Sequence, residues 1–307
     1  MDESGYQKMI QNYRQVASFF QDKNILRINP IDSIWKSKNT ILKLDCDDGR
    51  LYLFKRISED SEISEIAKAA KLAQEYPVLF PQIFIVDRNA YLMEFIEGRT
   101  FFTLAREEMV PFSSQCGKIL QETWSGDING IKGLERKEPE RKDLRGIIRD
   151  SFGQRRKKAA RFFSQDELAD YDFSPFASVP ERQSHNDLNA ANLFYVSGAA
   201  AGIRMIDPQE LGFNDIARDI GRYCASTFFN NYDRFGNDKK HSLDIAEAFL
   251  DNFPEQDLER AKYYLGESFL SFLNYETISV SKAVLKNLAL KVLNQKGPLI
   301  TLLADSL

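Results

Sequence analysis

The stretch that decides the fold reads His185-Asn186-Asp187-Leu188-Asn189-Ala190-Ala191-Asn192, and Met205-Ile206-Asp207 follows it. Asp187 stands in a polar loop, and Asn192 follows after a tether short enough to hold both side chains beside one ligand. Asp207 ends a short apolar strand and adds a second carboxylate. Phosphoryl transfer needs a base beside the acceptor hydroxyl and oxygen ligands for a magnesium ion that bridges the phosphates. The stretch therefore predicts this chemistry.

Each of the three residues taken alone also fits a plainer role. Asp and Asn are frequent in turns and at helix caps, where their side chains bond the nearby backbone. Asp215, which is not one of the three, likewise fits a cap for the helix that begins there. The spacing of all three together favours a site.

The residues before this stretch carry the pattern of a small sheet with helices. Asp48-Gly49 is a strong hairpin signal between two β-rich segments, and Ser61 and Pro77 bound a helical one. The expected elements are an amphipathic helix over 6–20, strands over 31–37, 40–46 and 50–57, a helix over 61–75, and strands over 82–86 and 90–96.

From about residue 103 the pattern is mainly helical. It is interrupted by the polar loop at 184–194 and by short apolar strands, and helical periodicity resumes at Asp215. We therefore expect an α+β chain with two lobes. The predicted domains are a nucleotide-binding lobe over 1–97 and a helical lobe over 98–307 that carries the catalytic loop and the acceptor site.

The loop from His185 to Phe194 resembles the HxDxxxxN catalytic loop of the aminoglycoside phosphotransferase and choline kinase family, and residues 206–222 resemble the segment that follows it there. The resemblance implies a two-lobed protein-kinase-like fold, with a small antiparallel-sheet lobe and a larger helical lobe. It also implies an ATP-dependent kinase that phosphorylates a hydroxyl of a small molecule, such as an antibiotic, an amino alcohol or a sugar. GTP is the alternative nucleotide. In these terms Asp187 is the catalytic base, and Asn192 and Asp207 are Mg²⁺ ligands.

The resemblance also assigns a nucleotide site to the amino-terminal part. Lys55, on the third predicted strand, would contact the α- and β-phosphates. Glu65, with Glu62 as second choice, would orient that lysine from the following helix. The backbone carbonyl of Glu94 and the backbone amide of Ile96 would bond the adenine edge in the hinge between the lobes.

The strand pattern leaves two positions open for Lys55. Residues that alternate along a strand share a face, so Lys55 lies on the face of Leu51 and Leu53. These apolar neighbours favour the cleft side. The alternative is an outward-facing lysine on an amphipathic strand.

Several positions depart from the usual family pattern. The expected phosphate loop, Ser37-Lys38-Asn39-Thr40, contains no glycine, and Asn186 stands where the family usually has glycine. Asn189 and Ala190-Ala191 replace the commoner His and Pro-Gly. His185 and Asp219 resemble structural residues that brace the catalytic loop. The span from Asp207 to Asp215 is too short for an activation segment of the protein-kinase type.

Composition excludes several other classes. A net charge of -4 argues against a global nucleic-acid footprint. The three cysteines have no spacing typical of a zinc site or a disulfide framework. The amino terminus lacks a secretory pattern, and no apolar run is long enough to span a bilayer. We therefore expect a cytoplasmic protein.

One local exception is the basic insert, which we define as residues 132–161, with twelve Lys/Arg against five Asp/Glu. A solvated helix face is the plainer interpretation, and an anionic substrate or partner is the functional one. Two further hypotheses follow for the whole chain. One is a nucleotide-binding regulatory module, a pseudokinase that acts through partners. The other makes the insert a contact for nucleic acid or an anionic membrane.

Overall fold

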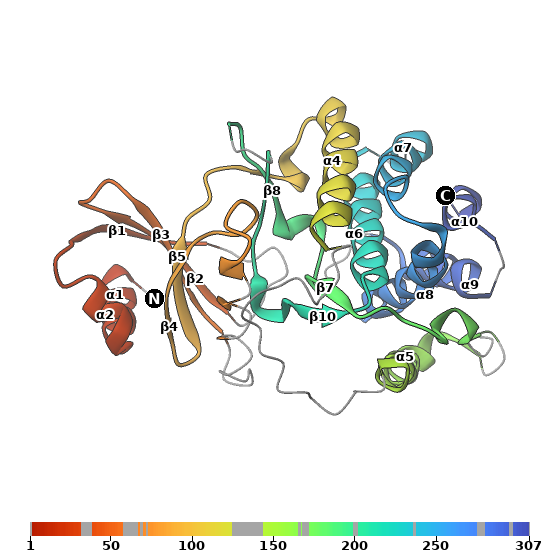
Figure 1. Ribbon diagram of the computed structural model, residues 1–307, viewed down its shortest axis with the longest axis horizontal. Helices are drawn as coiled ribbons and strands as arrows, with labels where there is room; N and C mark the ends of the chain where they lie inside the picture. The colour runs from red at the N-terminus through yellow and green to blue at the C-terminus, as the bar shows by residue number, and fades with distance from the viewer. Residues whose placement is uncertain are drawn as a thin grey trace. The chain divides into compact units, whose positions relative to one another are not determined.

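The computed structural model describes residues 2–31, 39–57, 67, 70–71, 73–124, 144–164, 167, 172–198, 202–235, 238–274, 280–294 and 297–306 (Figure 1). The chain forms two compact units. The first combines Met1–Thr100 with Ala191–Leu211, and the second combines Phe101–Ala190 with Gly212–Leu307. The predicted boundary between residues 97 and 98 stays a prediction.

An antiparallel sheet forms the centre of the first unit. Asp48-Gly49 makes the predicted hairpin, with Gly49 at a φ of 75° and its N–H bonded to the Cys46 carbonyl at 3.1 Å. The sheet has the order β1-β2-β3-β5-β4. Its strands are β1 (Ile25–Pro30), β2 (Thr40–Cys46), β3 (Leu51–Arg56), β4 (Ile83–Asp87) and β5 (Ala90–Glu94).

Two of the sequence predictions for this unit need correction. The first strand of the sheet lies at 25–30, a segment in which we predicted none, whereas the strand predicted over 31–37 falls outside the described residues beyond Ile31. The single helix predicted over 6–20 is two helices, α1 (Glu3–Gln11) and α2 (Arg14–Phe19), broken at Tyr13 in an extended conformation. The break is stabilised from the sheet, because the Asp87 carboxylate accepts the N–H of Gln15 at 2.7 Å.

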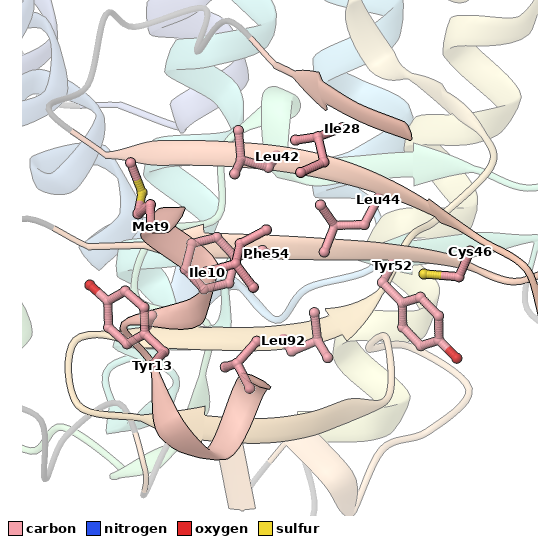
Figure 2. Packing of buried hydrophobic residues seen from close by; sticks show 12 residues of the cluster. Met9, Ile10, Tyr13, Ile28, Leu42, Leu44, Cys46, Tyr52, Phe54 and Leu92 are labelled. Atoms are coloured by element: carbon pink, nitrogen blue, oxygen red, sulfur yellow. The ribbon is translucent and has the colours of Figure 1, made fainter. Parts of the chain in front are cut away.

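The two helices cover one face of the sheet. Met9 and Ile10 from α1 and Tyr13 from the break pack on strand residues that alternate in sequence, such as Leu42 and Leu44 (Figure 2). This alternation leaves the opposite face of β3 to Leu53 and Lys55. A second, three-stranded sheet belongs to the same unit, in the order β6-β8-β9, with β6 (Arg99–Thr100), β8 (Leu193–Tyr195) and β9 (Ile203–Met205).

Among its described residues, the second unit is mainly helical and has one short strand pair, β7 (Arg182–Ser184) with β10 (Gly212–Asn214). Its described helices are α4 (Arg106–Trp124), α5 (Leu144–Ala159), α6 (Ala217–Phe235), α7 (Lys239–Leu250), α8 (Glu255–Phe272), α9 (Lys282–Asn294) and α10 (Leu299–Ser306). Helices α6 and α8 pack closely, and α6 follows directly after the β7–β10 pair. The sheet-then-helices order confirms the predicted α+β class. In the described part of the chain, no helix combines the length and the apolarity that crossing a membrane requires.

Candidate active site

The loop with Asp187 begins at β7 in the second unit and is fastened to α6. Asp219, fully buried in the first turn of α6, accepts a bond from Ser184 Oγ at 2.7 Å and one from the His185 N–H at 2.6 Å. Burial raises the pKa of Asp219, and the charge of His185 and these two bonds oppose that shift. The bonding supports the loop-bracing role that the resemblance implied for Asp219.

Asn186 holds an unusual backbone conformation in this loop. Its φ is 64°, in the left-handed region that favours glycine. Its side chain is held on both sides: Asn214 Nδ2 donates to Asn186 Oδ1 at 2.7 Å, and Asn186 Nδ2 donates to the Ser184 carbonyl at 3.3 Å. The glycine usual in the family is therefore replaced by a residue that tolerates this conformation and adds bonds to it.

Asp187 comes next, with its side chain one-third exposed. Arg222 of α6 donates from Nη1 both to Asp187 Oδ1 and, at 2.8 Å, to the Asn186 carbonyl. Asn189 Nδ2 lies 3.5 Å from the other carboxylate oxygen. The carboxylate of Asp187 is thus directed by an arginine that sequence reasoning did not single out.

A buried ionic cluster lies between this loop and α8. Arg260 donates from Nε and Nη2 to both carboxylate oxygens of Asp215, at 2.9 and 3.0 Å, and from Nη2 to Asp257 at 2.7 Å. Arg182 of β7 donates to Asp257 at 2.8 Å. Burial raises the pKa of Asp215, and the Arg260 guanidinium opposes that shift. Asp215 also accepts the Ala217 N–H at 3.1 Å at the start of α6, as its predicted capping role requires.

The first unit holds Lys55 and Asp207. Lys55 is almost fully buried on the face of β3 beside Tyr91, and its Nζ donates to Asp207 Oδ1. The Tyr91 hydroxyl donates to the same oxygen at 3.3 Å, and burial, with the Asp207 charge second, raises the pKa of Tyr91 well above its usual range. Lys55 therefore takes the inward position of the two that the strand pattern left open.

Asn192 and Asp207 flank one end of a strand pair. β8 and β9 are antiparallel, with Leu193 opposite Met205, and the Ile206 N–H bonds the Asn192 carbonyl at 2.9 Å. Asp207 is the next residue, at a φ of 63°. One carboxylate and one amide oxygen suit Mg²⁺, which binds through few protein groups together with substrate phosphates and water. The described residues contain no cluster of three or more His, Cys, Asp or Glu side chains that could hold a metal ion.

The predicted hinge follows β5. Glu94 is paired with Tyr52 of β3, and its carboxylate accepts Arg204 Nη2 at 2.8 Å, which ties β9 to this point. Arg204 Nη2 also donates to the Phe80 carbonyl at 2.9 Å. Ile96 is buried two residues after the strand. The carbonyl of Glu94 and the amide of Ile96 stay predictions as adenine contacts.

Some predicted site residues have no structural description. Glu65 and Glu62, both proposed partners of Lys55, lie outside the described residues, as do Ser37 and Lys38 of the expected phosphate loop. Sequence reasoning missed Tyr91 and Arg222, which contact the proposed site residues Asp207 and Asp187. Tyr91 is paired with Lys55 across β3 and β5, and this register is known only from the structure.

No protein-family model matches the sequence, and no curated protein is similar to it. Solved structures share its fold. A choline/ethanolamine kinase family protein from Mesorhizobium loti has a TM-score of 0.58 and 13% identity, over 100% of this chain and 99% of that one. An amicoumacin kinase in complex with AMP-PNP, Ca²⁺ and Ami has a TM-score of 0.55 and 12% identity, over 95% of this chain and 97% of that one. The ADP-bound aminoglycoside phosphotransferase APH(2'')-Ib has a TM-score of 0.52 and 12% identity, over 95% of this chain and 98% of that one.

These structural similarities extend over nearly the whole chain. The sequence identities are so low that the similarity shows the fold alone. They agree with the antiparallel sheet of the first unit and the helices of the second. The resemblance seen in the loop at 185–194 is thereby confirmed at the level of the fold. This chain has the two-lobed, protein-kinase-like fold of choline kinase-like and aminoglycoside phosphotransferase structures.

Proposed function

We propose that the chain is an ATP-dependent kinase that transfers the γ-phosphate to a hydroxyl of a small molecule, with GTP as the alternative nucleotide. The observation that carries the proposal is the ion pair between the buried Lys55 and Asp207, whose side chain is 23% exposed. A buried lysine is stable only with a counter-charge or a shifted pKa. A phosphate-binding lysine beside a metal-binding carboxylate meets this requirement both before and after nucleotide binds.

The chain's own residues take the following parts. Lys55 contacts the α- and β-phosphates, while Asp207 and Asn192 would hold Mg²⁺. When bound, that ion would offset the negative charge of the phosphates. The hinge backbone at Glu94 and Ile96 takes the adenine edge, and Glu65 supports Lys55 in place of Asp207. The similar structures bound to ADP and to AMP-PNP with Ca²⁺ support the proposed nucleotide and divalent cation.

Asp187 acts on the acceptor. Its carboxylate orients the hydroxyl, whose oxygen forms a bond to the γ-phosphorus as the bond from that phosphorus to the bridging oxygen breaks and ADP leaves. The hydroxyl proton passes to Asp187 late in this step. Arg222 holds the carboxylate in a fixed direction before the acceptor arrives.

The test is Asp187→Asn, which keeps the shape of the side chain and removes its basicity. We expect acceptor-dependent ADP release to fall about 10²- to 10⁴-fold, while nucleotide affinity, measured by calorimetry, stays unchanged. Asp22→Asn changes an exposed acid with no site role and serves as the control. Wild-type transfer rates in Asp187→Asn would refute the role of Asp187. Nucleotide binding without turnover in the wild type, over a broad acceptor panel, would favour the regulatory module instead.

A further inference from the structure

Arg222 presents more hydrogen-bond donors beside Asp187 than the protein uses. Its Nη1 makes the bonds to Asp187 and to the Asn186 carbonyl. Its Nε and Nη2 have no partner among the residues that the structure describes, and the side chain is 20% exposed. A guanidinium carries five N–H groups in a planar fork. The Nε–Nη2 edge of Arg222 can therefore still donate hydrogen bonds to a ligand.

The backbone that carries Arg222 is fixed with respect to the loop. Asp219, three residues earlier on α6, accepts the Ser184 and His185 bonds. Gly221 lies so close to α8 that a Cβ on it would stand 2.7 Å from the Leu265 nitrogen. The guanidinium is therefore held beside Asp187 by packed secondary structure, and its free edge has a defined position.

The positive charge of this edge would distinguish between acceptors of different charge. A hydroxyl that reaches Asp187 brings its own substituents next to Arg222. A cationic substituent would be repelled there, and a neutral one would gain little. A carboxylate or phosphate matches the fork with two parallel charge-assisted bonds, a geometry that arginine provides and lysine does not.

We propose that Arg222 determines acceptor specificity, and that the acceptor carries an oxyanion, a carboxylate or a phosphate, close to the hydroxyl that is phosphorylated. This inference rests on the proposed kinase function and narrows its substrate class. It differs from a role in which Arg222 only positions Asp187, because a positioning role affects all acceptors alike, whereas a specificity role depends on the charge of the acceptor.

The experiment uses four small alcohols that differ mainly in charge: glycerol, glycerate, glycerol 3-phosphate and the cationic amine serinol. Acceptor-dependent ADP release is measured for the wild type, Arg222→Met and Arg222→Lys. We expect the wild type to prefer glycerate or glycerol 3-phosphate, and the comparison of these two separates a carboxylate site from a phosphate site. In Arg222→Met the KM for the anionic acceptors should rise roughly 10- to 100-fold relative to that for glycerol. In Arg222→Lys, which keeps the positive charge, the KM for the anionic acceptors should rise less than in Arg222→Met.

Binding provides a readout that does not need turnover. Calorimetry with the Mg²⁺ complex of AMP-PNP present should show glycerate or glycerol 3-phosphate bound by the wild type and lost in Arg222→Met. Arg27→Met, an exposed arginine of β1, is the matched control and should bind as the wild type does. Equal losses for all four acceptors would make Arg222 a positioning residue only.

The two proposals fail in different ways. A wild-type preference for glycerol or serinol, or absence of anion binding, would overturn the oxyanion proposal and leave the kinase function standing. Anion binding that depends on Arg222, with no acceptor phosphorylated, would instead support the anion site and count against the kinase function.

Discussion

At the residue scale, two non-glycine residues of the proposed site have left-handed backbone conformations, Asn186 and Asp207. Such a conformation costs of order 1–3 kcal/mol for a residue with a side chain and persists only where the surroundings impose it. For Asn186 the surroundings are visible, since Asn214 and Ser184 bond its side chain. The strain lies next to Asp187 and helps to fix the direction in which that carboxylate points.

Substitution of Asn186 should therefore separate backbone strain from side-chain bonding. Asn186→Gly removes the strain and the Asn214 bond together, so we expect the free energy of unfolding to change by less than about 1 kcal/mol. Asn186→Val keeps the strain, loses the bonds and adds a β-branched side chain, and should lower that free energy by about 2–4 kcal/mol. Urea unfolding measures both. Equal midpoints for the two variants would contradict the positive φ.

Sequence reasoning at this scale worked where a residue type is tied to local spacing. Lys55 alternates with Leu51 and Leu53 on a strand, and the structure buries it on the same face as Tyr91. The contact between Arg222 and Asp187 could not be predicted in the same way. It joins a loop to the next helix, and a lone arginine in a helix pattern is usually a solvated one.

At the scale of elements, the packing of α6 on α8 depends on one missing side chain. A Cβ on Gly221 would meet the Leu265 nitrogen and Tyr264 Cβ at 2.7 Å and the Ala261 carbonyl oxygen at 2.8 Å. Two of these atoms are backbone, which cannot move away without shifting α8. The helix that carries Asp219 and Arg222 is thus seated directly on the backbone of its neighbour.

Gly221→Ala should destabilise the protein although alanine is the better helix former. We expect a loss of about 1–3 kcal/mol from overpacking, which exceeds the gain of about 1 kcal/mol in helix propensity. Gly153→Ala is the matched control: it lies in α5, where an added Cβ has nothing within 4 Å, and it should stabilise by up to about 1 kcal/mol. Thermal unfolding of the two variants gives the comparison, and shifts of the same sign would argue against the close approach.

The elements also show where local pattern fails. The spacing of apolar residues over 6–20 fits one helix, yet the chain breaks at Tyr13 because Asp87, far away in sequence, caps the second helix. β1 was missed for a related reason. Leu26 and Arg27 on it are exposed, so its pattern lacks the alternation that marks a half-buried strand. The strand forms because its backbone pairs with β2, a contact that the local sequence pattern does not indicate.

At the scale of the whole molecule, the first unit is built from two separate parts of the chain. Residues 191–211 bring β8 and β9, the counter-charge for Lys55 and a main-chain bond of 2.6 Å from Met205 to Leu79. Leu193, Ile203 and Met205 are fully buried in this unit. The first unit is therefore incomplete without a segment that lies about a hundred residues after its five-stranded sheet.

A fragment of residues 1–100 should accordingly be far less stable than one in which 191–211 is joined to it by a flexible linker. Loss of that segment exposes apolar surface and leaves Lys55 without its partner, each worth several kcal/mol. Circular dichroism with urea titration of both fragments measures the difference. If the short fragment unfolded cooperatively at the same midpoint, the added segment would be dispensable.

Because the first unit consists of two separate chain segments, its two parts are synthesised at different times. The ribosome delivers β1 to β5 early, whereas β8 and β9 emerge only after residues 101–190 have been made. At about 5–20 residues per second, the first unit stays unfinished for several seconds. Throughout that interval β6 lacks its partner strand β8 and Lys55 lacks its counter-charge, so the rate of translation through the intervening helices sets how long the newborn protein is vulnerable to aggregation.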